Sequence, residues 1–138
     1  MKKYILLLLF IPSLSQAGEF INGFNLSSPL LLSGTLGYRF SHDENPGMGP
    51  MIEGEAGIGG GKLLLGFDGM DEGFGFGVKA SYLFTWFEPV NIDPDNQYLG
   101  VELQAGNTGF IASLGGYTKI SGDDESFIAT LSLGIRFK

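Results

Sequence analysis

Residues 74–86 read FGFGVKASYLFTW, and this stretch decides the fold class. Its even positions hold Phe, Phe, Val, Ala, Tyr, Phe and Trp, whereas its odd positions hold Gly, Gly, Lys, Ser, Leu and Thr. Successive side chains of a β-strand point to opposite sides, so a period of two gives one apolar face and one small or polar face. An amphipathic helix would need a period of 3.6. The stretch therefore predicts a long β-strand.

The same period of two recurs along the chain. Further alternating segments occupy residues 30–40, 52–58, 63–67, 99–105, 110–120 and 127–137. Turn-forming residues separate them, at 42–47, 59–61, 68–73, 88–96, 106–109 and 121–125. Residues 18–26 give a weaker eighth segment, because Asn22 interrupts the alternation of Phe20, Phe24 and Leu26. We expect an all-β protein with eight strands.

The first seventeen residues, MKKYILLLLFIPSLSQA, have the features of a cleaved signal peptide. Lys2 and Lys3 precede the apolar stretch 4–11, and a small-x-small site ends at Ala17. This stretch is too short to cross a bilayer as a helix, which needs about 20 residues. We therefore expect a signal peptide over 1–17 and a single β-barrel domain over 18–138.

Composition excludes several classes of protein. The chain has 138 residues, 23 Gly, no Cys, one His and a net charge of −7. A disulfide-stapled mini-protein or a typical structural zinc site needs cysteine, and a nucleic-acid-binding protein needs a basic surface. A hydrophobic content of 43% is too high for a disordered chain. We expect no metal, no cofactor and no nucleic-acid partner.

Two kinds of barrel fit alternating strands. A soluble lipocalin-like barrel turns its apolar face inward, whereas a membrane barrel turns it toward lipid and encloses the polar face. All charges of the predicted strands lie on the non-aromatic face, namely Arg39, Glu53, Glu55, Lys62, Asp68, Lys79, Glu102, Lys119 and Arg136. Glycine, serine and balanced charge on this face are typical of a narrow lumen. We therefore favour an antiparallel up-and-down transmembrane β-barrel.

Two sets of residues are the candidate sites of such a barrel. The first is a lumenal ion-pair network of Arg39, Glu53, Glu55, Lys62, Lys79, Glu102, Lys119 and Arg136. A ligand site built from the same charges is the alternative. The second set is a lipid-facing aromatic girdle of Tyr38, Phe40, Phe74, Tyr82, Phe84, Trp86, Phe110, Phe127 and Phe137.

The signal peptide, the alternating strands and the final segment Leu131-x-Leu133-x-Ile135-x-Phe137 resemble the small bacterial outer-membrane β-barrel proteins. The resemblance covers the whole mature chain and implies location in the cell outer membrane of a Gram-negative envelope. It also implies recognition of a C-terminal aromatic residue by the outer-membrane assembly machinery. Lys138 follows Phe137 here, which departs from the family's pattern. The resemblance carries over no functional residue.

An even strand number would place both termini on the periplasmic side, together with the stretch Ser41–Pro50. The acidic loops 88–96 and 121–125 would then face outward, where they could contact lipopolysaccharide through divalent cations. His42 is the one histidine, and a solvated loop position is its simplest interpretation. We expect a structural or surface-interaction protein with a plugged polar lumen, neither a general porin nor an enzyme. The alternatives are an outer-membrane lipid-modifying enzyme and a soluble periplasmic lipocalin-like carrier.

Overall fold

The computed structural model describes residues 18–40, 48–69, 73–87, 95–107, 109–121 and 127–137. Residues 1–17, His42 and most of the acidic loop residues lie outside these ranges. No helix in the described part of the chain is long and apolar enough to cross a membrane.

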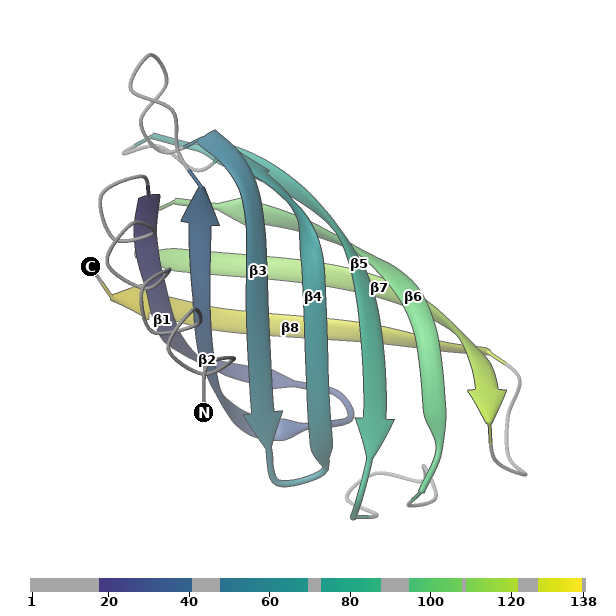
Figure 1. Ribbon diagram of the computed structural model, residues 1–138. Helices are drawn as coiled ribbons and strands as arrows, with labels where there is room; N and C mark the ends of the chain where they lie inside the picture. Colours follow the sequence, from purple (N-terminus) through teal and green to yellow (C-terminus); the bar gives the residue numbers. More distant parts are fainter. Residues whose placement is uncertain are drawn as a thin grey trace, which may run out of the picture.

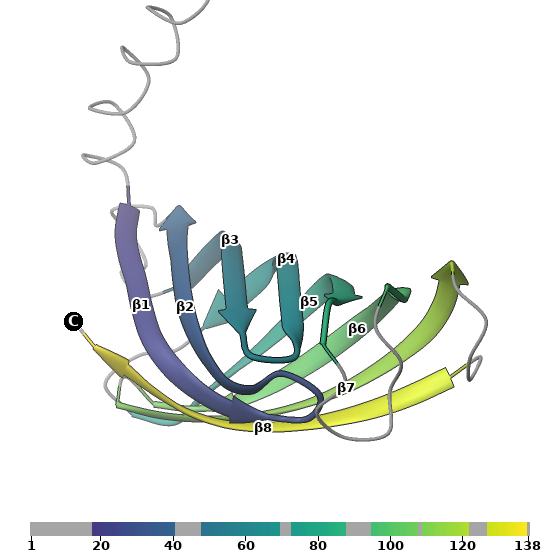
Figure 2. The same cartoon turned by 90° about the horizontal axis from the view of Figure 1, so that it is seen from below.

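The eight described strands form one closed barrel, shown in Figure 1. They are β1 (Gly18–Ser27), β2 (Leu31–Phe40), β3 (Met48–Gly57), β4 (Gly60–Gly69), β5 (Gly75–Thr85), β6 (Gln97–Gly106), β7 (Phe110–Ser121) and β8 (Phe127–Phe137). Each strand pairs antiparallel with the next, and β8 closes the barrel on β1 (Figure 2). The predicted all-β, up-and-down barrel of eight strands is therefore confirmed, including a first strand over the weak segment 18–26.

The register of the strands fixes the tilt of the barrel. A row of paired residues runs from Asn22 on β1 through Leu36, Gly54, Leu63, Tyr82, Leu99, Thr118 and Phe127. The row reaches β8 at Phe127, five residues before Ser132. Because Ser132 pairs with Ser27 and the strands are antiparallel, the row returns to β1 at a position ten residues further along the chain than Asn22. A stagger of this size in eight strands gives a tilt of about 40° from the barrel axis.

Both ends of the described chain lie at one end of the barrel, the terminal end, which holds Gly18 and Phe137. The opposite end, called the loop end, carries the turns 28–30 and 58–59. It also holds the last residues of β5 and β7. The predicted placement of both termini at the same end is thus found.

Two local predictions were wrong. Leu30 was expected to point outward from a strand, but it lies in the turn between β1 and β2 and is fully buried, because this turn folds over the barrel interior. The stretch 41–50 was expected to be a loop throughout, yet β3 already begins at Met48. Pro50 is tolerated there because β3 pairs with β2 only from Met51 onward, so no partner needs the missing N–H of proline.

Candidate functional site

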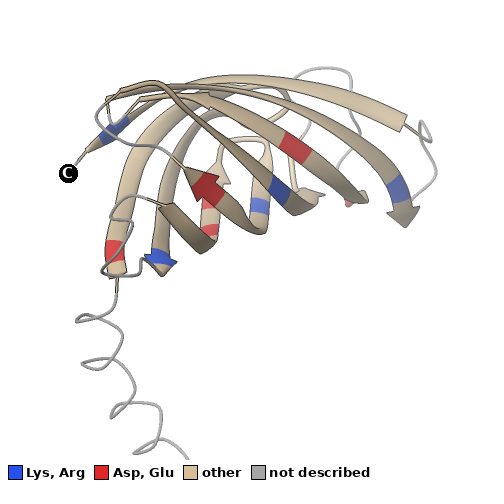
Figure 3. Cartoon of the chain, turned by 90° about the horizontal axis from the view of Figure 1, so that it is seen from above, with Lys and Arg blue, Asp and Glu red and all other residues tan. Residues whose placement is uncertain are grey.

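Strand alternation sends the charged residues of the barrel inward. Arg39, Glu53, Glu55, Lys62, Lys79 and Glu102 are each at most 4% exposed, and Asp68 is fully buried. The charged positions are spread over most of the strands, as Figure 3 shows. Most of the large apolar residues of the same strands point outward instead. The barrel is therefore charged inside and apolar outside.

The first of two interior clusters is centred on Lys62 of β4. Its Nζ lies 2.7 Å from Glu102 Oε1 of β6 and 3.4 Å from Glu55 Oε2 of β3. The hydroxyl groups of Tyr117 and Ser33 donate hydrogen bonds to Glu102 and Glu55, respectively. One cation thus lies between two carboxylates, and each carboxylate also accepts a neutral hydrogen bond.

Tyr117 on β7 extends this cluster across the lumen. Its hydroxyl also lies 2.9 Å from Ser81 Oγ of β5. Gly115 makes room for the tyrosine, since a Cβ atom at this position would lie 2.7 Å from the Tyr117 ring and 3.0 Å from Glu102 Cγ. The absence of a side chain at Gly115 is therefore a packing requirement of the Lys62 cluster.

The second cluster is centred on Arg136 of β8. Its guanidinium donates to Asp68 Oδ2 at 2.9 Å, to Glu53 Oε2 at 3.0 Å and to Gln104 Oε1 at 3.2 Å. Two further ion pairs extend it. Lys79 Nζ also lies 3.0 Å from Glu53 Oε2, and Arg39 lies 3.3 Å from Asp68 Oδ2. Residues from β2, β3, β4, β5, β6 and β8 are thereby joined through the interior.

Arg39 links this second cluster to the first strand. Its Nη1 donates a hydrogen bond of 3.0 Å to Glu19 Oε2, whose side chain is 40% exposed. The Arg136 cluster therefore approaches solvent at the terminal end. The Lys62 cluster is buried among the strands.

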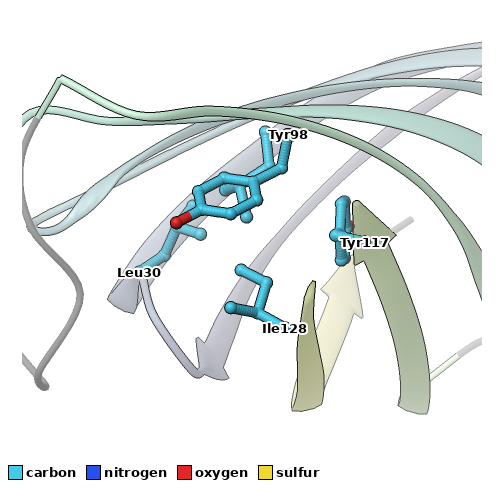
Figure 4. Packing of buried hydrophobic residues seen from close by; sticks show 5 residues of the cluster. Leu30, Tyr98, Tyr117 and Ile128 are labelled. Carbon is cyan, nitrogen blue, oxygen red and sulfur yellow. The ribbon is translucent and has the colours of Figure 1, made fainter. Parts of the chain in front are cut away.

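Apolar side chains fill the interior toward the loop end. Leu30, Leu83, Tyr98, Tyr117 and Ile128 form one buried cluster, four of which are labelled in Figure 4. Toward the terminal end, Ile21, Met51 and Ile111 are each 3% exposed. The Arg136 cluster thus lies level with the terminal-end apolar side chains, and the Lys62 cluster lies between these and the loop-end apolar cluster.

Lys119 is the one residue of the predicted network that is not joined to it. It lies on the inward face of β7 near the loop end, and its Nζ is buried without a hydrogen-bond partner in the described part of the chain. The other seven predicted residues all belong to the two clusters. Besides Ser33, Ser81 and Glu19, the clusters include three further residues that were left out of the predicted set, namely Asp68, Gln104 and Tyr117. Asp68 had the same sequence signal as the others, since it is a charge on the non-aromatic strand face, whereas nothing in the local sequence distinguishes the two neutral residues.

The predicted girdle residues lie on the outward face and divide between the two barrel ends. Phe40, Phe74, Phe110 and Phe137 lie toward the terminal end, and Tyr82, Phe84, Trp86 and Phe127 toward the loop end. Six of the nine are at least 38% exposed, namely Phe40, Phe74, Trp86, Phe110, Phe127 and Phe137.

Tyr38 differs from the other girdle residues because it is only 8% exposed. It stands edge-on between the rings of Phe20 and Phe40, at centroid distances of 5.2 and 4.9 Å. Its ring therefore supports two exposed phenylalanines and forms little of the outer surface itself.

Apart from Lys119, the described interior cations are paired with carboxylates at short range, which suits charge neutralisation more than the binding of a charged ligand. Within the described ranges, no group of three or more His, Cys, Asp or Glu residues could hold a metal ion. The acidic loop residues predicted to bind divalent cations lie mostly outside these ranges. Comparison of the chain with protein-family models, curated proteins and solved structures returns no match.

Proposed function

We propose that this protein is a small outer-membrane β-barrel with a structural or surface-interaction role and a lumen closed by its own side chains. The observation that carries the proposal is the inverted polarity of the barrel. Twenty-eight large apolar side chains are exposed in the described residues, while the barrel interior holds buried ion pairs. In water such an outer surface would be a severe aggregation hazard, whereas hydrocarbon solvates it without cost.

The dimensions of the barrel support the same proposal. The strands are 10 to 12 residues long. A ten-residue strand rising about 3.3 Å per residue at a tilt of about 40° covers about 25 Å along the axis. This matches the apolar band of a transmembrane barrel, and strands of 9–11 residues are the expected length. Aromatic residues toward both ends of the outer face suit the two membrane interfaces.

The lipocalin-like alternative is not favoured. A soluble carrier barrel needs a polar exterior and an apolar cavity for its cargo. Here the exterior is apolar, and the middle of the interior is occupied by the Lys62 and Arg136 clusters. The other alternative, a lipid-modifying enzyme, depends on His42, which lies outside the described residues.

We infer that the lumen does not conduct ions. An eight-stranded barrel has an interior just wide enough for side chains to fill. Buried side chains occupy it along its length: the Arg136 cluster with Ile21 and Met51 toward the terminal end, then the Lys62 cluster, then Leu30 and Tyr98 toward the loop end. The proposal therefore excludes a general porin and assigns no catalytic activity. Outer-membrane lipids, lipopolysaccharide and the assembly machinery are the partners that it implies.

Fractionation of a Gram-negative host expressing the full chain tests the proposal. We expect the protein in the outer-membrane fraction after carbonate washing. We also expect the unheated protein to migrate faster on a denaturing gel than the boiled protein. Recovery in the soluble periplasmic fraction would refute membrane insertion. In planar bilayers we expect no steady conductance, and a stable open level would refute the closed lumen while leaving insertion intact.

A further inference from the structure

One outward-facing side chain does not suit a lipid environment. Apart from tyrosines, the polar residues on the outer face of the described strands are Asn22, Gln97 and Thr118. Gln97 and Thr118 lie toward the loop end of the barrel. Asn22 instead lies four residues inside β1, which is about 10 Å from the terminal end along the barrel axis. Its Cα partners Leu36 and Phe137 are both apolar.

Asn22 is exposed, and its carboxamide makes no hydrogen bond to any described residue. In the proposed membrane location this amide would meet hydrocarbon, where an unpaired polar group costs several kcal/mol. A partner beside the barrel must therefore supply the missing hydrogen bonds. Asparagine side chains serve this purpose between membrane-embedded segments.

A groove begins at Asn22 and crosses the outer face of β1, β2 and β3. It has a volume of about 640 Å³ and extends to Phe137 of β8 on one side and to Leu63 and Phe84 of β4 and β5 on the other, and the small residues Gly34, Gly54 and Ala56 are among its lining residues. A Cβ atom at Gly34 would meet nothing within 4 Å, and one at Gly54 only a carbonyl oxygen at 3.8 Å. Packing within the chain therefore does not require these two glycines, and they leave space that a neighbouring molecule can enter.

A second copy of this chain fits the groove and the asparagine together. A carboxamide carries both a donor and an acceptor, so two Asn22 side chains satisfy each other. A two-fold axis along the membrane normal places them at the same depth. If the axis passes between β1 and β2, Phe24 of one copy faces Gly34 of the other. Phe24 lines the groove of its own copy and is 58% exposed, so its ring is free to pack on Gly34 of the other copy.

A second groove of similar size provides the contrast. It has a volume of about 550 Å³ and lies over β4–β8, with Phe76, Leu103, Ala105, Ala112 and Leu114 among its lining residues. No polar side chain points outward from it. Lipid chains can cover this surface without leaving a hydrogen bond unmade, so it needs no protein partner.

We propose that the face formed by Asn22, Phe24, Gly34, Gly54 and Ala56 is a symmetric contact between two copies of this chain in the membrane. The inference rests on the proposed membrane insertion. It predicts a dimer held by a reciprocal Asn22 pair and by Phe24 packed on the partner's β2–β3 surface.

Single-cysteine cross-linking tests the contact, because the chain contains no cysteine. Gly34→Cys, in the full chain expressed in outer membranes, should give a disulfide-linked dimer on mild oxidation. Ala112→Cys, at similar depth in the other groove, is the matched control and should stay monomeric. Equal cross-linking of the two variants, or a Gly34→Cys adduct with a protein of different mass, would overturn the inference.

The strength of association in vesicles gives the second measurement. We expect Asn22→Leu to weaken dimerisation roughly tenfold, because the dimer would lose two intramembrane hydrogen bonds. Gly34→Leu should abolish dimerisation by filling the groove, and Ala112→Leu should leave it unchanged. Heat-modifiable migration of every variant checks insertion separately. A chain that inserts but remains monomeric refutes only the dimer, whereas a chain that fails to insert refutes the proposed function.

Discussion

Replacing Lys62 by methionine removes the one cation that lies between Glu55 and Glu102. The substitution keeps the length and apolar stem of the side chain, so the loss of charge dominates its effect. The lysine side chain is fully buried, and those of Glu55 and Glu102 are 2% and 5% exposed. Solvent therefore cannot replace the missing ammonium group.

The expected cost follows from the two distances. At an effective dielectric constant of about 20, unit charges 2.7 and 3.4 Å apart attract by about 6 and 5 kcal/mol. Desolvation of the lysine offsets several kcal/mol of this attraction. Removing one partner of a buried ion pair leaves an uncompensated charge and costs about 3–5 kcal/mol. We expect a loss in this range for Lys62→Met.

Lys119→Met is the matched control. It makes the same change on the same interior face, but Lys119 Nζ has no partner in the described residues. Removing an unpaired buried ammonium group should leave the stability unchanged or increase it. The two variants therefore separate the loss of an ion pair from the loss of a lysine.

Urea unfolding of the barrel in lipid vesicles measures both effects. The chain has one tryptophan, Trp86, so its fluorescence reports unfolding without ambiguity. With a urea dependence of about 2 kcal/mol per molar, Lys62→Met should lower the midpoint by about 1.5–2.5 M. If Lys62→Met and Lys119→Met unfold at the same urea concentration, the interior ion pairs do not stabilise the barrel and the reasoning fails.

Three further substitutions test other contacts by the same unfolding assay. For the variant that lacks tryptophan, circular dichroism replaces fluorescence as the measure of unfolding. Tyr117→Phe removes the hydroxyl that bonds Ser81 and Glu102, and should cost about 1–3 kcal/mol because a buried carboxylate loses a donor; an unchanged midpoint would contradict this. Gly115→Ala should destabilise the barrel by about 1–3 kcal/mol, since the new Cβ would lie 2.5 Å from Thr130 Oγ1. Gly116→Ala on the same strand, whose Cβ would lie 3.5 Å from the Phe127 ring in ordinary contact, is its control and should differ from it clearly. Trp86→Phe removes the 3.0 Å hydrogen bond from Nε1 to the Ile58 carbonyl and should cost about 0.5–1.5 kcal/mol; a stability gain would show that this bond does not hold the two loop-end segments together.

The strands could be predicted because each one carries its own signal. The alternation of residues 74–86 produces β5, and the inward or outward direction of each side chain follows from counting by two. Leu30 could not be placed in this way, because a turn that folds over the interior breaks the count. The same rule assigned Lys119 to the interior but could not show that its ammonium group finds no partner among the described residues.

The pairing of the interior charges could be predicted only in part. Glu55 and Lys62 are neighbours across a short hairpin, and they do pair. Lys79 and Glu102 are also cross-strand neighbours, yet Lys79 pairs with Glu53 and Glu102 with Lys62. Long side chains in a narrow lumen reach beyond their own ladder, so adjacency in the sheet does not fix their partners.

The strands, their polarity and the set of charges that share one face follow from a local period of two, so they can be read from the order of the residues. Which of these charges meet depends on the closed barrel. Arg136 and Glu53 are 83 positions apart and lie 3.0 Å from each other. Their meeting depends on the closure of β8 on β1 and on the ten-residue stagger, which sets the level of every strand along the axis. No local pattern encodes that stagger, because it is a property of the whole ring of eight strands.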